Sequence, residues 1–243
     1  MPFTFSHPAI VLPLKYLPKK WFSMTGLVIG SSTPDFEYFI RMKIESDYSH
    51  TFWGIFYFDL PLGILLTFIF HNLVKEELFR NLPQKLNQRF VKTEKTNWNK
   101  YFAENWKIVI LSIIIGTISH IFWDSFTHES GFFVKHFSEL SNSFEIFGKQ
   151  IMYLKLLQHS STLFGGIVIA YAIFKLPKVE NIKTKINYKY WLILFLINLL
   201  VFILRVIIGE NSKLIGNLIV SLITSVMIGI VITPMIMKKK NDI

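Results

Sequence analysis

The sequence predicts an all-α fold, a polytopic membrane helix bundle of about seven transmembrane or membrane-embedded helices. Hydrophobic residues make up 51% of the 243 residues and charged residues only 17%, whereas ordinary soluble domains carry about 25% charged residues. Crossing a hydrocarbon core about 30 Å thick takes roughly 17 to 25 apolar residues. Five segments approach or reach this length: 52–74, 108–127, 160–174, 191–208 and 214–237. The one at 160 is short for a span, so we expect it to begin a few residues earlier.

The first forty residues predict two further helices, shorter than a full span. Residues 8–17 and 21–33 are apolar and are separated by the polar break at 18–20, so we expect a helical hairpin. A cleavable signal peptide is the alternative for this region. It is disfavoured because no basic residue precedes the apolar part and no small-residue cleavage site follows it. We therefore expect this segment to stay in the protein.

Basic residues orient the predicted bundle. The net charge is +10, and the lysines and arginines concentrate at 15–20, 75–107, 175–189 and 238–240. Cytoplasmic loops carry an excess of such residues, so we expect the N-terminus outside and the C-terminus inside. This arrangement in loops predicts no nucleic-acid partner.

Two regional expectations follow from the same pattern. The loop at 75–107 is either an amphipathic segment on the inner leaflet or a solvated charged loop. The chain is expected to divide into a helical membrane domain with a metal site, 1–175, and two additional transmembrane helices with a basic cytoplasmic C-terminus, 176–243.

An ionisable motif interrupts the apolar segment 108–127. In the stretch GTISHIFWDSFTHESG, residues 116–131, His120, Asp124 and His128 are spaced four residues apart. Positions i, i+4 and i+8 drift by only about 40° per step on an α-helix, so we expect all three on one stripe. Ionisable groups are costly in hydrocarbon and mark functional sites that face a bundle interior. We favour a metal or proton-transfer site here.

The predicted topology places further polar residues near the same outer side of the first five helices. Each has an ordinary alternative: an interfacial histidine, a turn residue, or a polar residue at a helix end. The additional candidates are His7, Asp35, Glu37, His50, Glu129 and His159. His71 and His136 are taken as bystanders, and Glu210 is left out.

The chain contains no cysteine, so any metal must be held by nitrogen and oxygen ligands. Imidazole favours zinc, with manganese or iron as alternatives. The candidate ligands outnumber those that one tetrahedral ion needs. One ion with outer-shell partners and two ions that share ligands both remain open.

Five short motifs resemble those of a known family. They are MPFTFSHPA at 1–9, Pro34-Asp35, Ser49-His50, His120-x3-Asp124 and Gln158-His159-Ser160-Ser161. Over about residues 1–175 the chain resembles bacterial predicted membrane-bound metal-dependent hydrolases, most closely the DUF4184-type proteins. A shorter likeness, limited to a few residues, is to zinc-dependent phospholipase C. The resemblance implies a bacterial inner membrane. Relatives often carry Pro-Asp-x-Asp-His where this chain has Glu37 and Tyr38, and tyrosine does not readily replace a histidine on zinc.

The leading hypothesis is a metal-dependent hydrolase that acts on a lipid or lipid-linked substrate at the outer face, with a phosphoester as the expected bond. In this hypothesis the metal ligands are His7, Asp35, His120, Asp124, His128 and His159. His50 is a further ligand or a general acid, and Glu37 or Glu129 is the base. A metal-ion or proton-coupled transporter and a membrane scaffold with a structural metal are the alternatives. The sequence does not indicate the oligomeric state.

Overall fold

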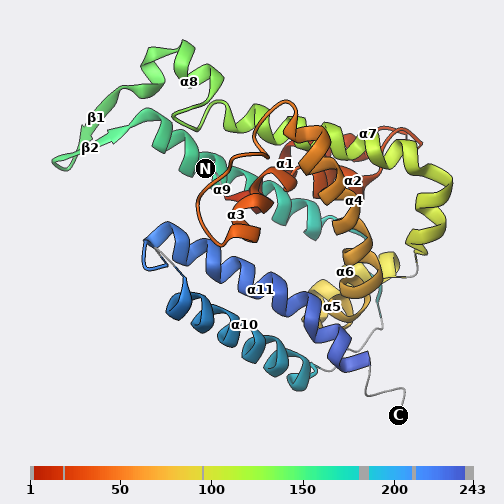
Figure 1. Ribbon diagram of the computed structural model, residues 1–243. Helices are drawn as coiled ribbons and strands as arrows, with labels where there is room; N and C mark the ends of the chain where they lie inside the picture. Colours follow the sequence, from red (N-terminus) through yellow and green to blue (C-terminus); the bar gives the residue numbers. More distant parts are fainter. Residues whose placement is uncertain (1–2, 19, 95, 181–185, 210–211, 239–243) are drawn as a thin grey trace. The chain divides into compact units, whose positions relative to one another are not determined.

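Five helices of the computed structural model are long and apolar enough to cross a membrane (Figure 1). They are Ile55–Asn81, Trp98–Asp124, Tyr153–Phe174, Tyr188–Ile208 and Ile215–Met237. Each overlaps one predicted apolar segment, and the third begins before residue 160 as expected. The fold class, an all-α membrane helix bundle, is therefore confirmed. Seven spans and the orientation of the termini remain predictions.

The structure describes residues 3–18, 20–94, 96–180, 186–209 and 212–238. Lys19, Lys239 and Lys240 of the basic clusters, and also Glu210, lie outside the described residues. Contacts divide the chain into two compact units. Unit 1 comprises Met1–Pro34, Tyr48–Ile64 and Asn105–Lys175, and unit 2 comprises Asp35–Asp47, Leu65–Glu104 and Leu176–Ile243. This clustering does not test whether 1–175 and 176–243 are separate domains, so that division stays a prediction.

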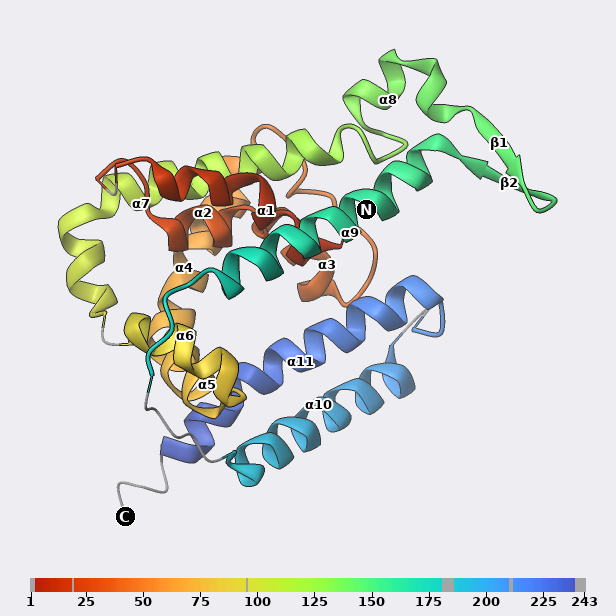
Figure 2. The same cartoon turned by 180° about the vertical axis from the view of Figure 1, so that it is seen from behind.

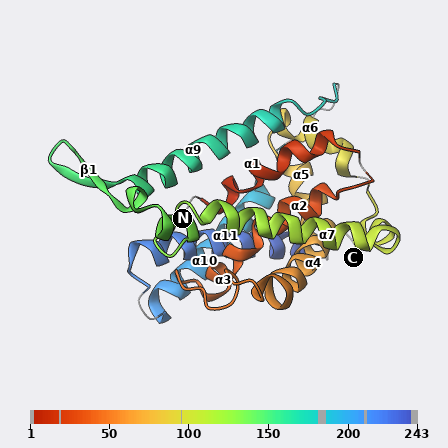
Figure 3. The same cartoon turned by 90° about the horizontal axis from the view of Figure 1, so that it is seen from above.

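Unit 1 contains the short N-terminal helices and two long ones. Its elements are η1 (Thr4–Ser6), α1 (Pro8–Val11), η2 (Leu12–Tyr16), α2 (Met24–Gly30), η4 (Ile55–Asp59), the start of α4 (Leu60–Ile69), most of α7 (Trp98–Asp124), α8 (Phe132–His136), η6 (Ser138–Ser141) and α9 (Tyr153–Phe174). In Figure 3, α1 lies between α7 and α9. The expected N-terminal hairpin is thus a pair of short helices, of which α2 has only seven residues.

A β-hairpin, which we did not predict, interrupts the connection from α7 to α9. Strands β1 (Ser143–Ile146) and β2 (Lys149–Met152) pair antiparallel, with Ser143 opposite Met152. Phe147 and Gly148 form the turn with positive φ angles of 50° and 73°. A two-residue turn with positive φ at both positions usually reads Asn-Gly or Asp-Gly, so Phe-Gly did not signal a hairpin.

Unit 2 is organised around α10 (Tyr188–Ile208) and α11 (Ile215–Lys238), which run side by side (Figure 2). It also contains α3 (Phe36–Arg41), η5 (Phe70–Val74), α5 (Lys75–Asn81) and α6 (Gln84–Glu94). The predicted loop at 75–107 is therefore largely helical, and its position on the inner leaflet remains a prediction. The backbone after α3 is fixed to α10 and α11, because Arg205 donates to the carbonyl oxygen of Met42 and Asn217 accepts from the amide of Ile44.

Glycines allow backbones of unit 1 to touch at two seams. A Cβ on Gly30 would lie 2.2 Å from the carbonyl oxygen of Ile113, and one on Gly116 would lie 2.4 Å from that of Leu27. Helices α2 and α7 therefore meet backbone to backbone, as small residues permit in membrane proteins. At the second seam, a Cβ on Gly165 of α9 would lie 2.7 Å from the Cβ of Ser6.

Two adjacent glycines of α9 test the second seam. Gly165→Ala should destabilise the protein by about 1–3 kcal/mol, because the new methyl group forces the segment around Ser6 away from α9. Gly166→Ala is the matched control, since a Cβ there meets nothing within 4 Å, and it should be neutral or stabilising. Thermal unfolding in detergent measures both. Equal melting temperatures for the two variants would contradict the tight seam.

Candidate metal centre

Four imidazole rings surround the carboxylate of Asp124. Asp124 is the last residue of α7 and is buried, with 4% of its surface exposed. Its Oδ1 lies 3.0 Å from Nε2 of His7. Its Oδ2 lies 3.2 Å from Nε2 of His120, 3.5 Å from Nδ1 of His128 and 3.6 Å from Nε2 of His50. In the described part of the chain, no lysine or arginine pairs with this carboxylate.

In two of these rings, the hydrogen bond of Nδ1 shows which ring nitrogen carries the hydrogen. Nδ1 of His7 lies 3.2 Å from the carbonyl oxygen of Thr4, and Nδ1 of His120 lies 2.8 Å from that of Ser31. A carbonyl oxygen only accepts, so each Nδ1 must carry the hydrogen and donate it. In a neutral imidazole, Nε2 then presents a lone pair to Asp124. Two acceptors in contact repel each other, so a cation, either a proton or a metal ion, is needed between them.

The end of α2 explains why His120 is held in this tautomer. The last carbonyl groups of a helix have no partner within the helix. Here Gly30 accepts from Thr33 and Thr117, and Ser31 accepts from His120. The side chains of α7 thereby cap α2, and the close seam at Gly30 and Gly116 brings them within reach.

His7 is held by a segment fixed to α9. It directly precedes Pro8, which starts α1, and proline is favoured at the first position of a helix. The amide of Phe3 donates to the hydroxyl of Thr162, and the hydroxyl of Ser6 donates to the carbonyl oxygen of the same residue. The ring of His7 is fully buried and stacks on that of His120, with centroids 3.7 Å apart and planes inclined by 19°.

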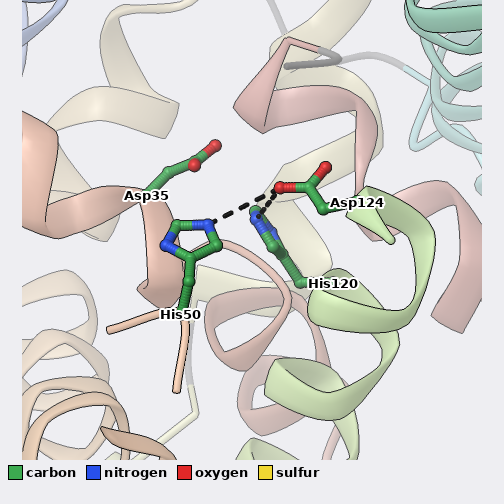
Figure 4. A group of neighbouring side chains, drawn as sticks. All are labelled: Asp35, His50, His120 and Asp124. Atoms are coloured by element: carbon green, nitrogen blue, oxygen red, sulfur yellow. Dashed lines mark ion pairs between the residues drawn. The ribbon is translucent and has the colours of Figure 1, made fainter. Parts of the chain in front are cut away.

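Asp35 and His50 complete a group with metal-site geometry (Figure 4). One ligand atom each from Asp35, His50, His120 and Asp124 lies within 4.8 Å of all the others. The boundary between the units falls inside a single turn, η3 (Thr33–Asp35), so the same turn that follows α2 also carries Asp35. His50 comes from the segment before η4, and its Nδ1 lies 3.1 Å from the hydroxyl of Ser49.

His128 lies beyond the helix that was expected to carry it. Because α7 ends at Asp124, the predicted stripe of three residues on one helix is wrong for His128. The chain turns after Asp124, yet the amide of His128 still donates to the carbonyl oxygen of Asp124, which keeps the ring beside the carboxylate. Burial lowers the pKa of His128 below its usual range. Its Nε2 is buried and has no hydrogen-bond partner among the described residues.

Three other predicted site residues lie in different surroundings. Glu37 is buried in α3, where its Oε1 accepts from Arg41 at 2.7 Å and from the amide of Asp47 at 2.9 Å. His159 on α9 and Glu129 after α7 are exposed. Within the described ranges, no ion pair or hydrogen bond joins either of them to the cluster. Their roles, and that of Glu37, remain predictions.

Sequence reasoning did not single out one buried carboxylate. Asp59 is fully buried at the end of the π-helical segment η4. An acidic residue alone in the apolar stretch 52–74 was the available signal, by the same argument that identified Asp124. His136, taken as a bystander, is exposed, and its ring stacks on that of Phe132.

The arrangement has the features of a metal centre. Metal-binding histidines generally donate their second ring N–H to a carbonyl or carboxylate, which fixes the tautomer, and His7 and His120 both do so. The donor set of nitrogen and oxygen suits zinc and other transition metals. The buried cluster of Asp35, His50, His120 and Asp124 is therefore able to bind a metal ion.

Fold and site together define a class: a helical protein with several candidate membrane spans and a buried histidine–aspartate cluster suited to a metal. The chain belongs to the DUF4184 family, because the family model described as "Domain of unknown function (DUF4184)" matches residues 1–235. The predicted family is thus confirmed, and the match extends past residue 175 into α10 and α11. Comparisons with curated proteins and with solved structures found no match. The likeness to metal-dependent hydrolases and to phospholipase C stays a prediction.

Nε2 of His7 and His120 and the Asp124 carboxylate are all acceptors. We therefore expect Asp124→Asn to be more stable than the wild type without metal and less stable with zinc. Without metal, the new amide donates to Nε2 of His120 or His7 and replaces a repulsive contact, so the variant should be more stable than the wild type by about 1 kcal/mol. Zinc at 100 times Kd should stabilise the wild type by about 2.7 kcal/mol. This gain exceeds the variant's advantage of about 1 kcal/mol, so with zinc present the wild type should be the more stable protein. Thermal unfolding with chelator and with added zinc measures both.

His136→Ala is the control for this comparison, because His136 is exposed on α8. It should follow the wild type under both conditions. If chelated Asp124→Asn melts below the chelated wild type, the imidazoles are already protonated and donate to Asp124.

Proposed function

We propose that this protein is an integral-membrane, metal-dependent hydrolase that acts on a lipid or lipid-linked substrate, with a phosphoester as the bond cleaved. In this proposal the site faces the outer side of a bacterial inner membrane. The observation that carries the proposal is the ring of imidazole nitrogens around the buried Asp124. Such a ring needs a cation, and its histidines are oriented as metal ligands are.

A divalent metal ion held here would supply Lewis acidity and make a water molecule more acidic. The chain's own residues hold the ligand atoms in place, since His7 and His120 are fixed through their Nδ1 atoms. Zinc is the metal we favour, with manganese or iron as alternatives.

Of the two carboxylates predicted as the base, Glu129 is the better candidate. Glu129 directly follows His128 and is exposed, so it is accessible to a proton. The carboxylate of Glu37 is engaged by Arg41 and by the amide of Asp47. An arginine partner stabilises the charged form and makes a carboxylate a weaker base. His50 is retained as a ligand or a general acid.

An apolar groove next to the cluster supports a lipid substrate. Its volume is about 300 Å³, which is at the lower end of the range for small-molecule sites. It is lined by Ala9, Ile10, Phe122, Trp123, Phe126 and Phe164. Trp123 precedes Asp124, and its ring meets that of His7 edge-on at 5.8 Å. A hydrocarbon chain in this groove would therefore lie one side chain away from the cluster.

Hydrolysis should depend on Asp124. We expect the zinc- or manganese-loaded wild type to release product from a lipid phosphomonoester or phosphodiester in mixed micelles. Asp124→Asn should lose more than about 100-fold in rate, because even outer-shell substitutions at metal sites cost 10- to 100-fold. Mass spectrometry of the lipids measures the product. A metal-loaded wild type that cleaves no phosphoester, ester or amide would contradict the proposal, and cation flux in proteoliposomes would then indicate a transporter.

Two neighbours on α9 test the groove. Phe164→Ala removes a lining ring and should raise KM for a long-chain substrate by about tenfold, since a phenylalanine ring that the substrate chain covers contributes about 1.5 kcal/mol, the lower end of the range for full burial. It should leave KM for a soluble short-chain analogue unchanged. Leu163→Ala is the control, because Leu163 is similarly exposed but does not line the groove. If both variants raise KM equally, the groove does not hold the substrate chain.

A further inference from the structure

We propose that the cluster binds two metal ions and that Asp124 bridges them. His7 would bind one ion, and His120 with His50 and Asp35 would bind the other. This inference rests on the metal-binding part of the proposed function. It resolves a choice that residue spacing alone leaves open, because it depends on how the rings of His7 and His120 are arranged.

The stacked rings cannot share one ion. A metal ion binds an imidazole in the plane of the ring, about 2.1 Å from the nitrogen. The rings of His7 and His120 are 3.7 Å apart and inclined by only 19°. Planes with this separation and inclination meet only far beyond the length of a metal–nitrogen bond. Each Nε2 therefore addresses its own position.

The spacing of the two rings is close to that of a two-metal centre. The centroids of the His7 and His120 rings are 3.7 Å apart. Two-metal sites that catalyse displacement at phosphorus hold their ions roughly 3.5–4 Å apart. The stack of His7 on His120 thus sets a distance that suits a bridged pair.

The two oxygens of Asp124 are divided between the same two positions. Oδ1 lies 3.0 Å from Nε2 of His7, and Oδ2 lies 3.2 Å from Nε2 of His120. A carboxylate that presents one oxygen to each ligand set is placed to bridge. Asp124 is also the shared member of both sets.

The remaining candidate ligands are also divided between the two positions. The four residues whose ligand atoms lie within 4.8 Å of one another are Asp35, His50, His120 and Asp124. This set supplies four ligand atoms, the number that a tetrahedral site needs. Its two histidines, His50 and His120, lie beside Oδ2 of Asp124. On the Oδ1 side, His7 and Asp124 are the ligands that the described residues supply, so water or substrate would fill the remaining positions. The ion bound by His7 is therefore the more open of the two.

Metal analysis tests the inference without any turnover. The detergent-purified protein, loaded with manganese and freed of excess by gel filtration, should contain two equivalents by inductively coupled plasma mass spectrometry. Its electron paramagnetic resonance spectrum should show exchange coupling between the two Mn(II) ions. His7→Ala should retain one equivalent and give the hyperfine pattern of isolated Mn(II). Asp124→Ala should lose both equivalents.

His136→Ala is the matched histidine control and should keep two coupled ions, since its ring lies on α8 against Phe132. One equivalent of uncoupled manganese in the wild type would overturn the two-ion inference, even if the protein hydrolyses lipids. No bound manganese in the wild type would overturn it as well. Two coupled ions without hydrolysis would support it and contradict the proposed activity. The wild-type spectrum decides the question even if His7→Ala fails to fold.

Discussion

The contact between acceptor nitrogens and the Asp124 carboxylate is the constraint on which the arrangement of unit 1 depends. Removing a carboxylate from water costs several kcal/mol unless it is paired. Here the paired groups are imidazoles whose hydrogens point elsewhere, to the carbonyl oxygens of Thr4 and Ser31. The polypeptide alone therefore leaves the centre short of positive charge, which a proton or the proposed metal ion would supply.

The supporting structure is made of short helices and close backbone contacts rather than long helix interfaces. Buried carbonyl groups of the backbone need hydrogen-bond partners. The last carbonyl groups of α2 would lack them if Thr33, Thr117 and His120 did not donate. The glycine seam between α2 and α7 makes those bonds reachable. One set of contacts thus satisfies the backbone and fixes a ligand.

The sequence predicted the long helices and the centre of the site well. Apolar length is a local property, so all five long helices could be located. His120 and Asp124 stood out because charge is rare in an apolar stretch. The tautomers could not be predicted, since they depend on carbonyl oxygens of distant segments. His128 was placed on the helix because spacing does not show where α7 ends, and the hairpin was missed because its turn reads Phe-Gly. Polarity near the start of α9 suggested His159, which is exposed, and its role remains a prediction.

The separation of the ligands along the chain has a consequence for biogenesis. His7 and Asp124 are 117 residues apart, and the segment that holds His7 is fixed to Thr162, 156 residues beyond Ser6. Contacts of such high sequence separation form slowly, because the loop-closure entropy is lost before they stabilise the structure. During synthesis, the segment that carries His7 must therefore wait, apart from Asp124, until α9 has emerged. In the proposed metal-bound protein, metal loading is then a late event in maturation, and the cell must keep the unfinished chain from capturing the wrong ion in the interval.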